Sequence, residues 1–483
     1  MSLIQILIFA AAALLYGLLL KGRGRGWFML VASVLALYWL QPSTPIRNLD
    51  FWLPTASLAL TVFVWAATSP QDHPATRLPD YLTILVIVGL IVAISLNRYI
   101  DYCCLTPTRP PDILRVLIAL VILASLMFVA SRFRNNQHRP HPAFGGAYAQ
   151  RCGLLITILI LLFICLKFDP LAQTFSAALR ALNGQSVAQA SALDIRWLGF
   201  SYLAFRLIHA LRERINGKLP ELSLQEFLIY AVFFPALTAG PIDRVERFVK
   251  DLRAPFGLTA TDVSDGGWRL LWGIFKKFAL ADTLALIALN GVNASQAASP
   301  LWLWVLLYSY AFRIYFDFSG YTDIALGLGR LLGVKLPENF DRPYLKQNLT
   351  TFWNSWHISL AQWFRVYYFN PVTRALRARS LSPALIISFT QFTTMILIGL
   401  WHGVTWNFVV WGAWHGLGLF IHNRWADFIK PRATLLDTRP LLKRAAGWGG
   451  ALLTFHYVTL GWVWFALPEI GLAGRVMMNL FGI

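Results

Sequence analysis

Acidic residues and cysteines are scarce in this sequence. Of its 483 residues only 23 are Asp or Glu and only 4 are Cys, and charged residues of both signs make up 13%. The cysteines have neither the spacing of a zinc site nor the density of a disulfide framework. Their pattern therefore excludes a small domain held together by a metal or by disulfides.

The chain also lacks several catalytic motifs. It has no Gly-x-Ser-x-Gly elbow and no Walker loop, which disfavours a self-contained serine hydrolase and an ATP-driven pump. No carboxylate occurs between Asp341 and Asp427, and no two histidines have the His-x-x-x-His spacing that zinc sites often use. We therefore expect neither a bound metal nor a bound cofactor.

Apolar residues dominate the sequence instead. They make up 57% of it, with 20 Trp and 34 Phe, which is the profile of a polytopic membrane protein. The formal net charge of +19 is carried mainly in short segments between apolar runs, a pattern typical of basic cytoplasmic loops rather than of a nucleic-acid-binding face. We therefore expect contact with membrane lipid and no nucleic-acid partner.

Apolar runs long enough to cross, or nearly cross, a bilayer core follow one another through the first part of the chain. They lie at 3–20, 27–41, 51–68, 81–97, 113–131, 152–167 and 192–211. The loops 21–26, 132–151 and 212–224 are basic. This charge pattern predicts that these three loops lie in the cytoplasm and that the N-terminus is extracytoplasmic.

Beyond residue 225 the apolar runs are interrupted. Residues 227–238 are apolar, and 239–244 end that run because Gly and Pro break helices and charges avoid lipid. Residues 245–253 predict a short amphipathic helix on the membrane surface. The interruption separates a simple series of spans from a more complex second part.

Two further spans are predicted at 268–289 and 302–318. We expect 319–323 to break the second one, because it combines Ser, Gly, Thr and Asp. Arg313 and Asp317 are four residues apart and so share a helix face, where a structural ion pair is favoured over catalysis.

Polar and aromatic residues are mixed between 337 and 370, which predicts a re-entrant segment buried within the protein. Apolar runs at 383–401, 404–422 and 446–467 follow. We therefore predict an all-α polytopic membrane protein with about eleven to thirteen transmembrane or re-entrant helices. Its expected parts are N-terminal transmembrane helices at 1–190, a core at 191–467 and a C-terminal tail at 468–483.

His402 is the most conspicuous ionisable residue. It stands between two apolar runs, and an ionisable group at bilayer depth is expensive and is a functional candidate by default. His415 has the same Trp-His-Gly setting. At ~100° per residue the two lie on nearly opposite faces of a continuous helix, so only a break at Gly403 or Gly412 lets both line one cavity.

Several motifs in order resemble the membrane-bound O-acyltransferase (MBOAT) family, over roughly residues 190–465. They are Ala239-Gly240-Pro241-Ile242-Asp243-Arg244, Tyr315-Phe316-Asp317-Phe318-Ser319-Gly320-Tyr321-Thr322-Asp323, Glu338-Asn339-Phe340, Phe352-Trp353, Trp356-His357-Ile358-Ser359-Leu360 and Trp401-His402-Gly403. The resemblance is to the bacterial branch, whose members include the alginate O-acetylation membrane protein and the D-alanyl transfer protein of teichoic acid modification.

This resemblance implies a helical bundle with a funnel or tunnel through the membrane. By motif, His402 corresponds to the catalytic histidine, acting as general base, and His357 to the second histidine. The further candidates for lining the substrate path are Trp353, Trp356, Trp401, Trp406, Asn407, His415, Asp317, Asp323 and Asn339.

The implied function is transfer of an acyl group, acetyl in the first instance, from a cytoplasmic thioester to a hydroxyl of an extracytoplasmic polysaccharide or partner protein. The co-substrate is then acetyl-CoA or an acyl carrier protein, and the protein lies in the bacterial plasma membrane. Ser355 and Val366 replace an Arg and an Asp that the family usually has, which leaves the donor open. D-alanyl transfer and, in a different class, a proton-coupled transporter remain alternatives.

Overall fold

A computed structural model describes residues 1–19, 24–69, 78–100, 106–135, 147–297, 299–379, 381–432 and 439–483. Within these ranges the only β pairing is an isolated bridge between Phe340 and Trp356, and all other regular structure is helical. The predicted all-α class is confirmed. The basic loops at 21–26 and 132–151, on which the predicted orientation depends, lie partly outside the described residues.

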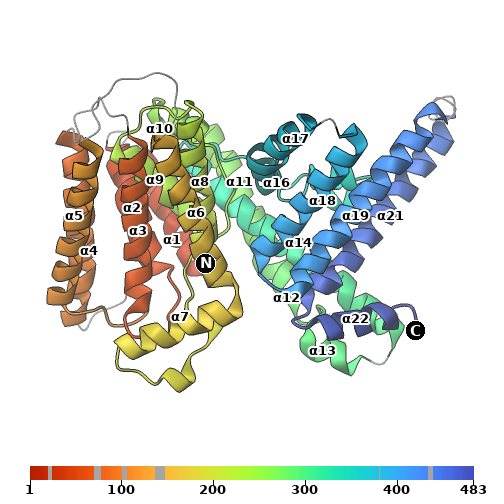
Figure 1. Ribbon diagram of the computed structural model, residues 1–483, viewed down its shortest axis with the longest axis horizontal. Helices are drawn as coiled ribbons and strands as arrows, with labels where there is room; N and C mark the ends of the chain where they lie inside the picture. The colour runs from red at the N-terminus through yellow and green to blue at the C-terminus, as the bar shows by residue number, and fades with distance from the viewer. Residues whose placement is uncertain are drawn as a thin grey trace. The chain divides into compact units, whose positions relative to one another are not determined.

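The fold divides into two compact units, which are described one at a time (Figure 1). The first comprises Met1–Gly267 and Ala325–Leu336, and the second comprises Trp268–Ile324 and Pro337–Ile483. Two helices, α11 (Ala260–Ile274) and α14 (Pro300–Leu331), contain residues of both units.

The first unit begins with long apolar helices and continues with shorter ones. Its helices are α1 (Leu3–Leu19), α2 (Arg25–Trp39), α3 (Leu49–Thr68), α4 (Leu78–Leu96), α5 (Ile113–Asn135), α6 (Ala147–Lys167), α7 (Asp169–Leu182), α8 (Phe200–Ile215), α9 (Leu224–Val232) and α10 (Val245–Arg253), with 3-10 turns η1 (Asn97–Tyr99), η2 (Val187–Gln189), η3 (Ala192–Asp194) and η4 (Phe234–Ala236). Helix α10 has the bounds of the predicted amphipathic helix, and the predicted break at 239–244 is confirmed.

Helices of membrane-spanning length are present in the described part of the chain. Those long and apolar enough are Leu49–Thr68, Leu78–Tyr99, Ala149–Lys167 and Pro383–His402, and the shorter apolar ones are Leu3–Leu19, Arg25–Trp39, Ile113–Leu126 and Leu224–Ala236. Large apolar side chains cover their outer faces, among them Leu85, which is 69% exposed. Such a surface fits a lipid environment, in which helices satisfy their own backbone hydrogen bonds.

Two arginines of the first unit are buried and bind helix ends. Arg25 donates to the carbonyl oxygens of Leu332 and Ala254, and Arg206 donates to those of Ala231 and Ala236. Both side chains are nearly inaccessible. Cations satisfy the unpaired carbonyls at helix C-termini and interact favourably with the helix dipole, so these two charges support the fold rather than a basic surface.

Helix α7 occupies residues that no predicted span covers. Its buried residues Ala172, Ser176 and Arg180 are spaced four apart and so form one stripe. Arg180 and Ser176 both donate to the carboxylate of Asp194, at 2.8 and 2.6 Å. The helix is amphipathic rather than apolar throughout, so its sequence contains no apolar run of spanning length.

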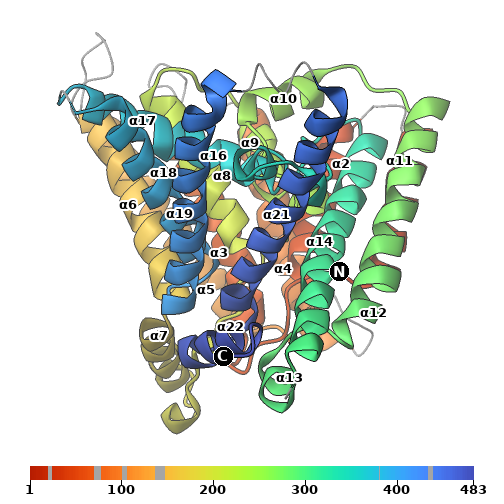
Figure 2. The same cartoon turned by 90° about the vertical axis from the view of Figure 1, so that its right-hand side faces the viewer.

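The second unit contains the remaining helices. They are α12 (Asp282–Ala285), α13 (Gly291–Gln296), α15 (Leu349–Trp353), α16 (Ile358–Phe364), α17 (Asn370–Arg377), α18 (Pro383–His402), α19 (Trp406–Ile429), α21 (Pro440–Ala466) and α22 (Ile470–Asn479), with η5 (Phe275–Ala281) and η7 (Arg365–Phe369) as π-helical turns and η6 (Pro343–Leu345) and η8 (Lys430–Arg432) as 3-10 turns. Figure 2 shows α18 and α19 side by side, with α21 next to α19.

The predicted break at 319–323 is wrong, because α14 runs through it without interruption. Gly320 serves close packing instead: a Cβ there would lie 2.8 Å from the carbonyl oxygen of Gly273. Asp323 is kept in the helix by ion pairs with Arg269 and Lys276. Polar and glycine residues thus mark a helix contact in this segment, not a turn.

Candidate functional site

The helical conformation is interrupted at Gly403, between α18 and α19. His402 is the last residue of α18, and Gly403 is extended, with φ −177° and ψ 146°. The glycines of the two helices allow close contact, because a Cβ at Gly399 would lie 2.2 Å from the carbonyl oxygen of Phe408. His402 and His415 therefore belong to different helices of one hairpin. They are not on opposite faces of a continuous helix, so both can contribute to one cluster.

His402 is half-buried and surrounded by aromatic rings. Its ring centroid lies 4.7 Å from that of Phe465, 5.6 Å from Trp411 and 5.8 Å from Phe408. The ring centroid of Trp401, the residue before His402, lies 4.6 Å from that of His402. The rings come from α18, α19 and α21, so three helices hold the imidazole in place.

His415 contacts the same tryptophan but is fully buried. Its ring lies 4.9 Å from Trp411 and 5.1 Å from Trp353. Neither of its ring nitrogens has a hydrogen-bond partner among the described residues. A Cβ on Gly461 would stand 3.1 Å from Nε2 of His415, so the ring is packed against the backbone of α21. Trp411 thus joins the two histidines into one cluster.

His357 lies at the start of α16 in a left-handed conformation, with φ 45° and ψ 53°. Its Nδ1 lies 3.2 Å from Oδ1 of Asn339, which is completely buried. Oδ1 of Asn339 also accepts from the backbone N–H and hydroxyl of Ser359, at 3.0 and 2.9 Å. The loop before α15 is thereby fastened to the first turn of α16.

These contacts determine which nitrogen of His357 carries the proton. Because a backbone N–H donates to Oδ1 of Asn339, that atom is an oxygen and accepts from Nδ1 of His357 as well. In the neutral imidazole, Nε2 is then the unprotonated nitrogen. Nε2 is buried and has no hydrogen-bond partner within the described part of the chain, so it is available to accept a proton or a hydrogen bond.

The predicted tryptophans Trp353, Trp356 and Trp401 lie around these histidines. The ring of Trp401 lies 5.9 Å from that of His357, and Trp401 precedes His402. Trp356 packs on Phe340 and Trp462 at 5.1 and 5.2 Å. His357, His402, His415, Trp353, Trp356 and Trp401 are therefore connected through ring contacts within the second unit.

Asp317 and Asp323 form ion pairs with the neighbouring helix. Asp323 is buried and lies 2.6 Å from both Arg269 and Lys276. Asp317 pairs with Lys277, so the predicted partner Arg313 is not the one that the structure provides. Both carboxylates join α14 to α11 and η5, which is a bracing position.

Asn407 and Trp406 lie at the first turn of α19. The side-chain amide of Asn407 donates to the carbonyl oxygen of Leu467 at 2.7 Å, where α21 ends. Trp406 is 73% exposed, which places it on the surface of the second unit. The ring of Trp406 is not among those that contact the histidines, and the amide of Asn407 is used at the end of α21.

Sequence reasoning missed Phe465, Phe318 and Trp462. Phe465 contacts His402, and Phe318 lies 4.7 Å from His357. Phe318 stands inside one of the motifs that carry the family resemblance, whereas only the local density of aromatic residues points to Phe465 and Trp462. Among the described residues no group of three or more His, Cys, Asp or Glu is placed to hold a metal ion.

The fold and the site thus define a class of protein: a helical membrane protein with a buried cluster of histidines and tryptophans. The model of the membrane-bound O-acyltransferase family matches residues 143–460. This chain belongs to that family. The predicted site residues all lie inside the matched range, whereas Trp462 and Phe465 lie just beyond its end. Most of the long helices of the first unit precede it.

Named relatives differ in the reactions for which they are named. The probable alginate O-acetylase of Pseudomonas syringae pv. tomato is 34% identical over 59% of this chain and 51% of its own length. The teichoic acid D-alanyltransferase of Streptococcus thermophilus is 30% identical over 72% of this chain and 83% of its own. The peptidoglycan O-acetyltransferase of Helicobacter pylori is 32% identical over 56% of this chain and 52% of its own length. The chain spans about half the length of the alginate O-acetylases that it matches.

Proposed function

We propose that this protein is a membrane-bound O-acyltransferase that moves an acyl group, acetyl in the first instance, from a cytoplasmic thioester to a hydroxyl on the other side of the membrane. The donor is acetyl-CoA or an acyl carrier protein, and the acceptor is an extracytoplasmic polysaccharide or a partner protein. Family membership and two relatives named as O-acetylating enzymes support the proposal. The observation that carries it is the position of His402, half-buried at a helix break and surrounded by aromatic rings.

In the proposed reaction His402 is the general base. It takes the proton of the acceptor hydroxyl, whose oxygen attacks the carbonyl carbon of the thioester. The carbon–sulfur bond then breaks, and the thiol leaves with the proton that the histidine returns. General base catalysis of this kind contributes roughly 10²–10⁴-fold.

His357 has a different role in this proposal. With Nδ1–H donating to Asn339, neutral His357 offers a lone pair at Nε2 and no proton. It therefore orients an acceptor hydroxyl by accepting from it, while an oxyanion needs donors. The indole N–H groups of Trp353 and Trp411 are buried without a partner among the described residues, and they are the donors that we assign to the carbonyl oxygen.

The protein is proposed to lie in the bacterial plasma membrane with its N-terminus extracytoplasmic. The basic loops of the sequence support this orientation through the positive-inside rule. A cytoplasmic donor then approaches from the side of those loops, and the acceptor approaches from the other side.

Wild-type protein tests the donor directly. Purified protein is incubated with acetyl-CoA labelled in the acetyl group and with an acceptor oligosaccharide, and mass spectrometry follows the label. The proposal expects labelled ester on the acceptor. Absence of labelled product, together with proton-coupled flux in protein-containing liposomes, would establish the transporter alternative instead.

D-alanyl transfer from a carrier protein is the second candidate. It is favoured by the S. thermophilus relative, whose match extends over 72% of this chain and 83% of the relative. The same assay with a D-alanyl-loaded carrier protein separates the two. Transfer from the carrier and none from acetyl-CoA would select D-alanylation.

A further inference from the structure

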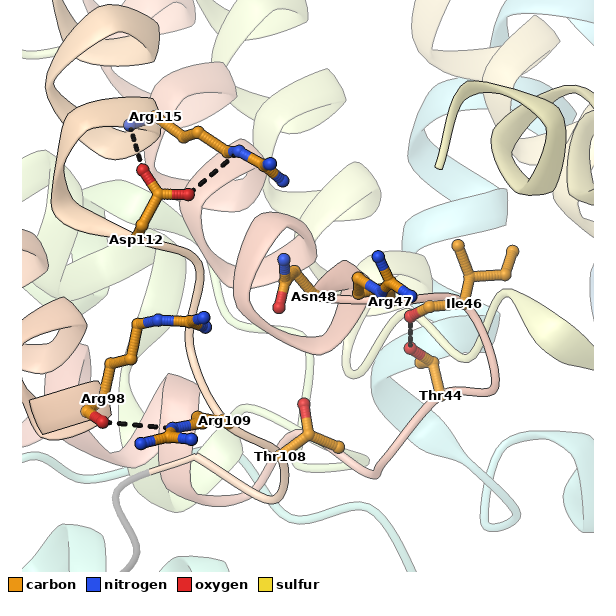
Figure 3. A pocket seen from close by; sticks show the side chains of 9 residues that line it. All are labelled: Thr44, Ile46, Arg47, Asn48, Arg98, Thr108, Arg109, Asp112 and Arg115. Atoms are coloured by element: carbon orange, nitrogen blue, oxygen red, sulfur yellow. Dashed lines mark hydrogen bonds and ion pairs between the residues drawn. The ribbon is translucent and has the colours of Figure 1, made fainter. Parts of the chain in front are cut away.

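The first unit contains a cavity of about 420 Å³ outside the histidine cluster (Figure 3). Its walls are the segment between α2 and α3, Arg98 in η1, and the segment that leads into α5. Sites for small ligands typically have volumes of ~300–1,000 Å³. All lining residues precede residue 143, where the family match begins, so no family property assigns this cavity.

Four arginines line the cavity: Arg47, Arg98, Arg109 and Arg115. The one carboxylate among the lining residues is that of Asp112, which lies 2.9 Å from Arg115. The two side chains of this pair are 65% and 35% exposed, and exposed pairs of this kind are weak. The cavity therefore presents an excess of positive charge to a ligand.

The arginines keep most of their donors free for a ligand. Arg98 donates from Nη1 to the carbonyl oxygen of Pro110 at 2.8 Å. Arg109 donates from Nε to the carbonyl oxygen of Arg98 at 3.1 Å, as Figure 3 shows. Each guanidinium has five N–H donors, and these bonds use one apiece. Arg47 is held through its backbone, whose N–H donates to Gln185. The bonds fix the wall and leave the planar groups available for bidentate binding of oxyanions.

Helix ends add to the positive potential. Helix α3 begins after Asn48 and α5 begins after Asp112, and both of these residues line the cavity. Helix N-termini favour anions through their free N–H groups and the helix dipole. Thr108 is anchored by its hydroxyl to both carboxylate oxygens of Asp50. At α5 the carboxylate of Asp112 already accepts from the backbone N–H of Arg115, whereas Asn48 makes no side-chain cap at α3. The N-terminus of α3 and the four arginines therefore supply the positive potential of the cavity.

We propose that this arginine pocket binds carboxylate or phosphate groups of an acidic extracytoplasmic glycopolymer, the acceptor of the reaction. The inference rests on the proposed function and its orientation, in which the segments after α2 and before α5 are extracytoplasmic. Thr44 and Asn48 add polar groups that suit sugar hydroxyls. Ile46 is the one apolar lining residue, so the pocket does not suit an acyl chain, and a phospholipid could offer it only a headgroup.

The test is direct binding by the full-length protein in nanodiscs, without any acyl donor. The probes are a soluble oligouronate, a soluble oligo(glycerol phosphate) and a neutral oligosaccharide of similar length. The variant is the double substitution Arg47→Gln and Arg109→Gln, both at exposed positions. The control is Arg196→Gln, an exposed arginine of the same unit that donates to Leu193.

We expect wild type and the control to bind at least one acidic oligomer equally and to bind it more weakly in higher salt. The double variant should bind it about ten-fold or more weakly, because it lacks two guanidinium groups that form charge-assisted hydrogen bonds to oxyanions. Neutral oligosaccharide should not bind.

Equal binding by the double variant, or equal binding of the neutral oligomer, overturns the proposal. So does binding of the acidic oligomer that disappears when the nanodisc lipid is changed from zwitterionic to anionic, because a lipid headgroup would then be the occupant. The binding measurement does not depend on acyl transfer. The proposal for the pocket and the proposed function can therefore be refuted independently.

Discussion

His402 and His415 have the same sequence neighbours but different surroundings. His402 is half-buried at a helix break, whereas His415 is fully buried in mid-helix with both nitrogens lacking hydrogen-bond partners among the described residues. A general base must come within hydrogen-bond reach of the proton that it removes. Accessibility therefore favours His402 as the base and a packing role for His415.

Replacing His415 by Leu should leave most activity intact. Leu fills a similar volume and removes two polar atoms whose burial without partners is costly. We expect the rate of acyl transfer to stay within a few-fold of wild type and the Tm to stay the same or rise. The rate is measured with the labelled donor and the Tm by thermal unfolding in detergent. A loss as large as that of His402→Ala would show that His415 takes part in the chemistry.

The sequence indicated which residue types form the site but not all of their contacts. Motif order placed His357, Trp356 and His402, and the structure connects them through ring contacts. The anchoring of His357 by Asn339 depends on a loop that pairs with residues almost twenty positions away, which local pattern does not reveal. Trp406 stays a prediction: it is 73% exposed and is not among the rings that contact the histidines.

At the scale of elements, the hairpin of α18 and α19 depends on glycine. Gly399 lies where a Cβ would be 2.2 Å from a backbone carbonyl oxygen. Gly399→Ala should therefore force the helices apart and destabilise the protein by roughly 1–3 kcal/mol or more. The matched control is Gly449→Ala in α21, where nothing lies within 4 Å of the new Cβ.

The control should instead stabilise the protein slightly, because Ala in a helix is roughly 0.5–1 kcal/mol better than Gly. Thermal unfolding of both variants in one detergent measures the difference. The close-packed hairpin is refuted by equal Tm values for the two variants.

The junction between α7 and η3 should make stability depend on pH. Burial raises the pKa of Asp194, but hydrogen bonds from Arg180, Ser176 and the backbone of Ser191 outweigh it and hold that pKa below the ordinary value. The carboxylate then stabilises the folded state above its unfolded pKa of about 3.9. This stabilisation is lost as the pH falls through the folded-state pKa.

Asp194→Asn should accordingly lower the Tm at pH 7, with a loss of about 3 kcal/mol expected for breaking a buried pair. The difference from wild type should shrink at pH 3. Asp265→Asn is the control, since its pair with Arg330 is 49% and 36% exposed and such pairs contribute little. A Tm difference for Asp194→Asn that is the same at pH 7 and pH 3 would contradict the assignment.

Helix α14 shows that local composition alone does not predict where a helix ends. Ser, Gly, Thr and Asp at 319–323 predict a turn in isolation, yet Gly320 and Asp323 are used for contacts with α11 and η5. Tertiary packing and ion pairing override local propensity at such positions. Spans that read as uninterrupted apolar runs, such as α3 and α18, were predicted to within a few residues.

For the whole molecule, composition predicted the class, and charge was the less reliable guide. Part of the positive charge is structural, because Arg25 and Arg206 are buried at helix C-termini. Another part lines the arginine pocket, which only the folded chain brings together from three segments. Positive charge in this chain therefore has structural roles as well as a topological one.

The central claim is that His402 removes the acceptor proton in acyl transfer. The most direct measurement compares wild type, His402→Ala and His422→Ala, a half-buried histidine of α19, in the labelled-donor assay with matched protein amounts. We predict that His402→Ala loses activity by roughly 10²-fold or more at a near-wild-type Tm, while His422→Ala keeps it. Acyl transfer by His402→Ala at the wild-type rate would contradict the account.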